Sequence, residues 1–113
     1  MLFRSILIVD DSPENIISLK IVLEKNDFEV DTASSGEEAL KKILQKSYVL
    51  IILDVQMPGM DGWEVARRLR ENPNFDHTKI FVMSSVADNI DRSERQKLNI
   101  HSFMAKPVTY QEL

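Results

Sequence analysis

The chain has 113 residues and a mass of 13.0 kDa, enough for one domain with a single core but too little for a second catalytic lobe. Its net charge of −4 and 43% apolar content argue against disorder and against a basic nucleic-acid-binding surface. The lack of cysteine excludes disulfides and thiolate zinc sites, and no apolar stretch approaches the roughly 18 residues of a membrane span. With no secretory signal at the N-terminus, we expect one cytoplasmic domain over residues 1–113, without nucleic-acid or membrane contacts.

The first half of the chain predicts two strands, each followed by a helix. Residues 6–9 form a continuous apolar run, typical of a strand covered on both faces, whereas residues 28–32 alternate apolar with polar and suit a sheet edge. Helix starts are indicated by Ser12 before a proline and by the serines at 34–35 before two glutamates. The apolar stripes expected along these two helices are Ile16, Ile17, Leu19, Ile21 and Leu23, then Ala39, Leu40, Ile43 and Leu44.

The second half continues the same alternation. Residues 49–53 and 80–83 are apolar runs that predict central strands, and residues 102–105 form a short mixed segment that suits the other sheet edge. Asp61, three residues before a glutamate, predicts the start of a third helix, which an Asn-Pro pair at 72–73 ends.

A fourth helix, from about residue 87 to residue 98, has few large apolar side chains. It is therefore expected to pack weakly, with Asn99 as a left-handed cap. The chain then reaches Leu113 barely one turn into an expected fifth helix, which would be truncated.

Alternation of strand and helix, without repeat or linker, predicts right-handed crossovers and a parallel sheet with helices on both faces. With the edge strands placed as above, the strand order is 2-1-3-4-5. The expected fold is therefore a flavodoxin-like, doubly wound α/β sheet of five strands.

Polar residues follow the carboxyl ends of these strands, where doubly wound sheets bind ligands. Asp10 and Asp11 follow the first strand, Asp54 the third, two serines the fourth and Lys106 the fifth. Three carboxylates placed together repel one another unless a cation intervenes, and Mg²⁺ suits oxygen ligands of this kind. Asp54 could then act as a nucleophile toward a phosphoryl donor, with Lys106 and a serine hydroxyl stabilising the phosphoryl oxygens.

The segments that carry this chemistry are IVDD at 8–11, LDVQMPGMDG at 53–62, SS at 84–85 and KP at 106–107. Together they resemble bacterial receiver domains of two-component response regulators, over nearly the whole chain. The resemblance implies that Asp54 accepts a phosphoryl group from the phosphohistidine of a sensor histidine kinase or phosphotransfer protein. It implies Mg²⁺, for which Mn²⁺ can substitute, bound by Asp11, Asp54 and the backbone carbonyl of Gln56, and by Asp10 through water.

The same resemblance implies that Lys106, Ser84 and the backbone of Ser85 contact the phosphoryl group. Ser84 and Phe103 would move together as a switch, and the peptide bond before Pro107 would be cis. The fourth helix, fifth strand and fifth helix would signal to an effector domain or protein, or form a phosphorylation-dependent homodimer. Such a domain is no enzyme beyond catalysing its own phosphorylation and dephosphorylation. Ser84 replaces the commoner threonine, which keeps the hydroxyl.

Other interpretations stay open at this point. An aspartate-nucleophile phosphohydrolase would want a second acid two residues after Asp54, where Gln56 stands. A flavodoxin-like cofactor carrier would want a phosphate-binding loop where the aspartate pair stands. A phosphorylation-independent interaction module on the same fold would not need the acidic cluster. Taken singly, Asp11 could equally be a helix cap and Asp61 is better explained as one; Trp63, His77 and His101 are interpreted as structural.

Overall fold

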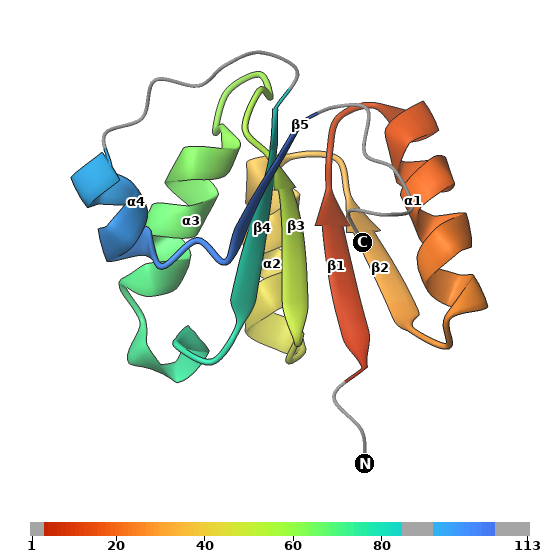
Figure 1. Cartoon of the computed structure of the whole chain (residues 1–113), viewed down its shortest axis with the longest axis horizontal. Helices are drawn as coiled ribbons and strands as arrows, with labels where there is room; N and C mark the ends of the chain where they lie inside the picture. Colours follow the sequence, from red (N-terminus) through yellow and green to blue (C-terminus); the bar gives the residue numbers. More distant parts are fainter. Residues whose placement is uncertain (1–3, 85–91, 106–113) are drawn as a thin grey trace.

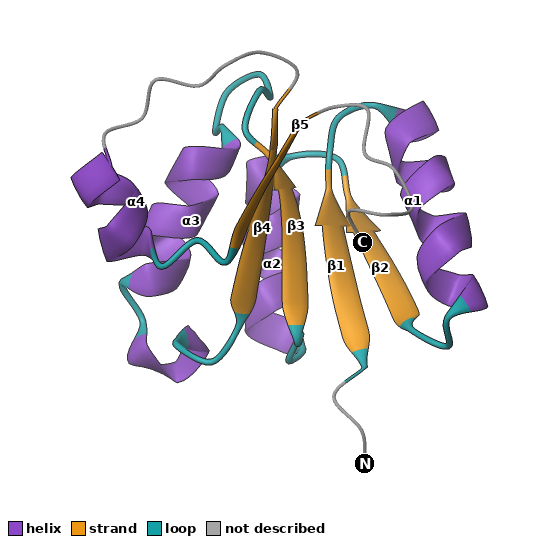
Figure 2. Cartoon of the chain, in the orientation of Figure 1, coloured by secondary structure: helices purple, strands orange, loops and turns teal. Residues whose placement is uncertain are grey.

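The computed structural model describes residues 4–84 and 92–105, which form a five-stranded parallel sheet flanked by helices (Figures 1 and 2). The strands are β1 (Ser5–Val9), β2 (Glu29–Ala33), β3 (Leu50–Asp54), β4 (Lys79–Ser84) and β5 (Ser102–Ala105). The helices are α1 (Pro13–Lys25), α2 (Gly36–Gln45), α3 (Gly62–Arg70), the 3-10 turn η1 (Pro73–Phe75) and α4 (Arg92–Leu98). No helix in these described ranges is long and apolar enough to cross a bilayer.

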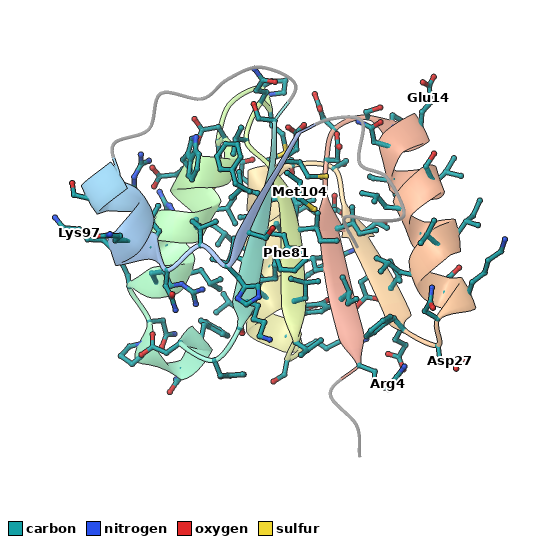
Figure 3. The ribbon with its side chains drawn as sticks, in the orientation of Figure 1. Arg4, Glu14, Asp27, Phe81, Lys97 and Met104 are labelled. Atoms are coloured by element: carbon teal, nitrogen blue, oxygen red, sulfur yellow. The ribbon has the colours of Figure 1, made fainter. Side chains whose placement is uncertain are left out.

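The strand order β2-β1-β3-β4-β5 confirms the predicted flavodoxin-like fold. Successive side chains of a strand point to opposite faces, so β1 contributes to two cores. Leu7 and Val9 pack on the face covered by α2, α3 and α4, whereas Ile6 and Ile8 pack on the face covered by α1. Figure 3 shows side chains filling the space on both faces.

The three predicted helix starts are confirmed, and each has a side chain that accepts a hydrogen bond from a first-turn N–H group. Ser12, Ser35 and Asp61 cap α1, α2 and α3. These bonds satisfy donors that the first helical turn leaves without partners. Asn99 has φ +51°, which confirms the predicted left-handed residue after α4.

The predicted apolar stripes were too wide. Ile17, Ile21 and Leu44 are exposed to 57%, 49% and 73%, although each lies in a predicted stripe. In an α-helix a step of one residue rotates the side chain by about 100°, so a neighbour of a core residue can point outward. Leu19 and Leu23 are the buried residues of α1. The predicted start of the fourth helix and the truncated fifth helix lie outside the described residues.

Arg70, at the end of α3, holds the C-terminal end of α4 against the turn that leads into β4. Its guanidinium donates to the carbonyls of Leu98 (2.7 Å) and Asn99 (3.2 Å) in and just after α4. It also donates to the carbonyls of Phe75 (2.9 Å) and Thr78 (2.8 Å) before β4. Carbonyls at a helix end lack partners within the helix and favour a cation, so one side chain satisfies groups from two elements.

Replacing Arg70 with methionine is expected to lower the free energy of unfolding by about 2–3 kcal/mol, because several partly buried carbonyls lose a charged donor. Urea denaturation of the two proteins measures this difference. Arg70→Lys should retain only part of the stability, since an ammonium group cannot reproduce the planar fork of donors. A methionine variant as stable as the wild type would show that water replaces the guanidinium without loss.

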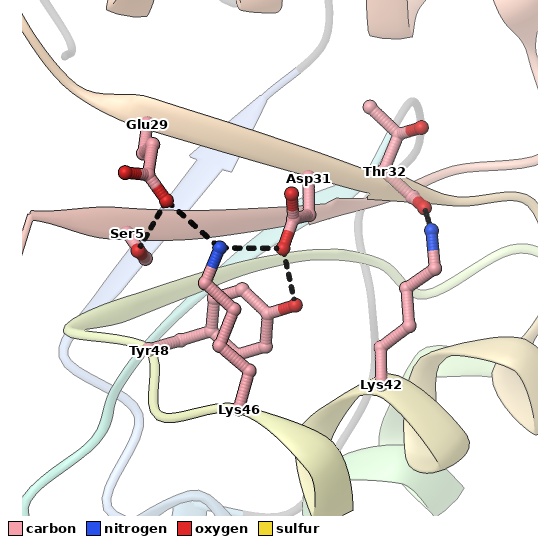
Figure 4. A network of polar contacts seen from close by, with 7 residues as sticks. All are labelled: Ser5, Glu29, Asp31, Thr32, Lys42, Lys46 and Tyr48. Atoms are coloured by element: carbon pink, nitrogen blue, oxygen red, sulfur yellow. Dashed lines mark hydrogen bonds and ion pairs between the residues drawn. The ribbon is translucent and has the colours of Figure 1, made fainter.

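A polar network joins the outer edge of the sheet to the region after α2 (Figure 4). Lys46 Nζ lies 2.9 Å from Glu29 Oε1 and 3.1 Å from Asp31 Oδ2, and the Tyr48 hydroxyl donates to Asp31 Oδ2 at 2.7 Å. Lys42 donates to the Thr32 carbonyl. Burial raises the pKa of Asp31, but the hydrogen bonds from Tyr48 and Lys46 outweigh burial and lower the pKa overall.

A lowered pKa in the folded state means that Asp31 stabilises the protein above its unfolded pKa of about 4. This contribution is lost as the pH falls through the lower folded value. Asp31→Asn should therefore lower the melting temperature at neutral pH and make its decline on acidification shallower. Thermal melts across the acid range measure both effects, with Glu24→Gln as a control of equal charge change at an exposed carboxylate. If the melting temperature of Asp31→Asn fell as steeply with decreasing pH as that of the wild type, the lowered pKa of Asp31 would be contradicted.

Candidate functional site

The three predicted aspartates come together at the carboxyl ends of β1 and β3. The two strands pair in parallel with Val9 opposite Leu53, so Asp10 and Asp54 follow at the same level. Carboxylate oxygens of Asp10, Asp11 and Asp54 all lie within 4.8 Å of one another. The structure thus brings together side chains that are 43 and 44 residues apart (54 − 11 and 54 − 10).

Two of these carboxylates are buried and accept backbone or side-chain hydrogen bonds. Asp10 is 0% exposed and accepts from Ser12 N (2.9 Å) and from Asn15 Nδ2 (3.2 Å). Asp54 is 1% exposed and accepts from Gln56 N at 3.0 Å. Asp11 is exposed. Such donors offset the desolvation of a buried carboxylate, so the site can keep charged groups below the surface.

Of the two aspartates considered as helix caps, Asp61 is one and Asp11 is not. Asp61 caps α3, accepting from Glu64 N at 2.9 Å, as predicted. The cap of α1 is Ser12, so Asp11 is not its N-cap. An exposed carboxylate next to a buried pair, with no capping role, is well placed to contact a ligand arriving from solvent.

The first residue of α3, Gly62, packs closely against the backbone of Asp54. A Cβ on Gly62 would lie 2.4 Å from the Asp54 carbonyl oxygen and 2.9 Å from Val55 Cα. Gly59, in the loop between β3 and α3, has φ +73°, a left-handed conformation that glycine adopts without strain. Glycine at these two positions lets the loop turn and lets α3 begin directly beside the cluster.

Ser84, the predicted site residue of β4 that the structure describes, lies at the same end of the sheet as Asp54. Asp54 is paired with Met83, so Ser84, 2% exposed, is one residue further along β4. Ser84 is paired in turn with Ala105, the last residue of β5. The predicted roles of Ser85, Lys106 and Pro107 fall outside the described residues and stay predictions.

Phe103 is partly buried and packs against Trp63 of α3, with ring centroids 6.2 Å apart and an interplanar angle of 34°. Trp63 belongs to the core, in agreement with its predicted structural role. His101 stacks on Phe81, with ring centroids 5.5 Å apart, which agrees with its own structural interpretation. The aromatic pair of α3 and β5 was not predicted, because its members are 40 residues apart (103 − 63) in a sequence without local signals for pairing.

The donor set fits a hard divalent cation. At separations within 4.8 Å, two carboxylate charges repel each other by on the order of 3 kcal/mol or more at an effective dielectric constant near 20. An oxygen-only cluster of this kind favours Mg²⁺ over softer metals, which prefer imidazole or thiolate. Among the described residues, no histidine joins the cluster.

Comparison with known proteins identifies the family. The family model of the response regulator receiver domain matches residues 6–113. The chain belongs to this family. Receiver domains are signalling domains of two-component systems, in which response regulators accept a phosphoryl group and work with histidine kinases and effector domains.

Individual relatives agree with this assignment. Transcriptional regulatory protein ResD from Bacillus subtilis is 33% identical over 108 residues, which cover 96% of this chain and 44% of ResD. This receiver domain thus spans less than half the length of that curated relative. Among solved structures, chemotaxis protein CheY4 from Vibrio cholerae has a TM-score of 0.88 at 27% identity, covering 98% of this chain and 92% of CheY4. Response regulator TrrA from Thermotoga maritima, solved in complex with Mg(2+)-BeF, has a TM-score of 0.84 at 34% identity, covering 96% and 91%.

Proposed function

We propose that this receiver domain accepts a phosphoryl group on Asp54 from the phosphohistidine of a sensor histidine kinase or phosphotransfer protein, in a Mg²⁺-dependent reaction. The observation that carries the proposal is the convergence of Asp10, Asp11 and Asp54 within 4.8 Å at one end of the sheet. The Mg(2+)-BeF complex of TrrA supports a magnesium requirement, because that protein is 34% identical and shares the fold.

Asp11, Asp54 and the backbone carbonyl of Gln56 would hold the ion directly, and Asp10 would do so through water. When bound, Mg²⁺ supplies positive charge that offsets the repulsion between the carboxylates and the incoming phosphoryl oxygens. The hydrogen bond from Gln56 N fixes Asp54 Oδ1, which orients the carboxylate at the end of a buried strand. Mn²⁺, with similar oxygen preference, would substitute.

In the transfer step, a carboxylate oxygen of Asp54 forms a bond to phosphorus while the bond from phosphorus to the donor imidazole nitrogen breaks. The imidazole leaves and takes up a proton from solvent, and an acyl phosphate remains on Asp54. Such a step depends mainly on alignment and charge stabilisation. Lys106, the Ser84 hydroxyl and the Ser85 backbone would contact the transferred group.

The signal would then pass through Ser84 and Phe103. Ser84 is buried at the end of β4, and Phe103 packs on Trp63 at the start of α3. A shift of Ser84 toward the phosphoryl group would change the space beside Phe103 and alter the face formed by α4 and β5. That face would contact an effector domain or protein, or a second copy of the domain.

Incubation with acetyl phosphate and MgCl₂, followed by intact-mass analysis, tests the proposal. We expect one phosphoryl group per chain with Mg²⁺ or Mn²⁺ and none when EDTA is present, because the small donor needs only the domain's own site. A chain that gains no mass with the metal, or gains it equally in EDTA, would contradict the proposal.

A further inference from the structure

The first turn of α1 departs from the usual arrangement of helix caps. Ser12 Oγ accepts from Asn15 N at 3.5 Å, as the first half of a capping box requires. In the second half, the side chain three residues after the cap normally reaches back to the N–H of the capping residue. Here Ser12 N instead donates to Asp10 Oδ1 at 2.9 Å, and Asn15 Nδ2 donates to Asp10 Oδ2 at 3.2 Å.

Both donors therefore converge on the two oxygens of a single carboxylate. Asp10 is fully buried, and the terminal torsion of an aspartate side chain is broad when nothing restrains it. One donor on each oxygen fixes the plane of the carboxylate.

The residue type at position 15 matters for this arrangement. The glutamate that commonly completes a capping box would place a further negative charge beside a cluster of three carboxylates. The Asn15 amide is neutral, carries two N–H donors and is short enough to reach Asp10 from the first turn. It satisfies the buried carboxylate without adding charge.

We propose that Asn15 is a positioning residue for the divalent-cation site, acting through Asp10. It holds the Asp10 carboxylate in the plane in which Asp10 and its bound water meet the cation shared with Asp11 and Asp54. This inference rests on the proposed Mg²⁺ function of the same cluster. Groups that orient metal-binding residues through hydrogen bonds typically change metal affinity by about 10–100-fold when removed.

Isothermal titration of the folded 113-residue chain with MgCl₂ tests the inference through affinity, independently of phosphorylation. Asn15→Ala and the near-isosteric Asn15→Leu remove the donor while improving helix propensity, so α1 should not be weakened. We expect both variants to bind Mg²⁺ at least about tenfold more weakly than the wild type. Asn15→Gln, which keeps an amide on a longer side chain, should recover part of the affinity.

Ser12→Ala is the matched control. It removes the capping hydroxyl, but keeps the backbone N–H that contacts Asp10. It should lower the melting temperature in EDTA and leave the Mg²⁺ affinity unchanged. Asn15→Ala should do the opposite: it should weaken Mg²⁺ binding without weakening α1.

Two outcomes would overturn the inference. Asn15 variants that bind Mg²⁺ within about twofold of the wild type would show that Asp10 needs no such support. A loss of affinity in Ser12→Ala as large as in Asn15→Ala would assign the effect to the helix start as a whole. A wild-type chain that takes up no Mg²⁺ would instead refute the proposed function itself, so the two failures are distinct.

Discussion

Asp54→Asn is expected to abolish phosphoryl uptake from acetyl phosphate, while the variant keeps the wild-type fold. An amide lacks the anionic oxygen that attacks phosphorus, so the acyl phosphate cannot form. The replacement is nearly isosteric, and its oxygen can still accept the Gln56 N–H that holds Asp54 Oδ1. Intact mass after incubation with Mg²⁺ gives the stoichiometry directly.

Two further aspartate variants test whether the loss of uptake comes from the missing acceptor or only from the loss of a negative charge near the site. Asp61→Asn makes the same charge change near the site, but asparagine caps helices as well as aspartate does, so uptake should equal that of the wild type. Asp11→Asn keeps the proposed nucleophile, Asp54, but removes one of the proposed carboxylate ligands of Mg²⁺, so uptake should slow without disappearing. Equal phosphorylation of Asp54→Asn and the wild type would place the acceptor elsewhere in the chain.

Gly62→Ala is expected to lower the free energy of unfolding by about 3 kcal/mol, although alanine normally stabilises a helix relative to glycine. The added Cβ would lie 2.4 Å from the Asp54 carbonyl oxygen and 2.9 Å from the carbonyl carbon, both backbone atoms that no rotamer change can move. Either α3 or the end of β3 must shift. Because β3 carries Asp54, the proposed acceptor, the rate of phosphoryl uptake should fall together with stability.

Urea denaturation compares this variant with Gly59→Ala in the loop that precedes α3. A Cβ on Gly59 meets no atom within 4 Å in the described structure, so that variant carries only the strain of a left-handed φ, about 1–2 kcal/mol. The clash at Gly62 should therefore show as the larger stability loss and as the larger effect on phosphorylation. A Gly62→Ala variant at least as stable as the wild type would mean that helix propensity outweighs the contact.

The sequence alone determined the main plan of this receiver domain. Continuous apolar runs marked the central strands and mixed runs the edges, because a strand's pattern reflects how many of its faces are covered. The caps at Ser12 and Asp61 were readable because a cap and its N–H partner lie within one turn. Parallel strands end at one edge of a sheet, so the alternation of elements was enough to bring the three aspartates together.

The tertiary structure decided what depends on partners distant in sequence or on direction around a helix. Arg70 contacts carbonyls 28 and 29 residues away, and no local pattern distinguishes it from the neighbouring arginines of α3. The close contact of Gly62 with Asp54 depends on where the loop places α3. No local pattern marks Asn15 either, because its role depends on the direction in which its amide donates to Asp10. The spacing of apolar residues along the chain sets which helices and strands form, whereas the contacts between distant side chains depend on how those elements pack.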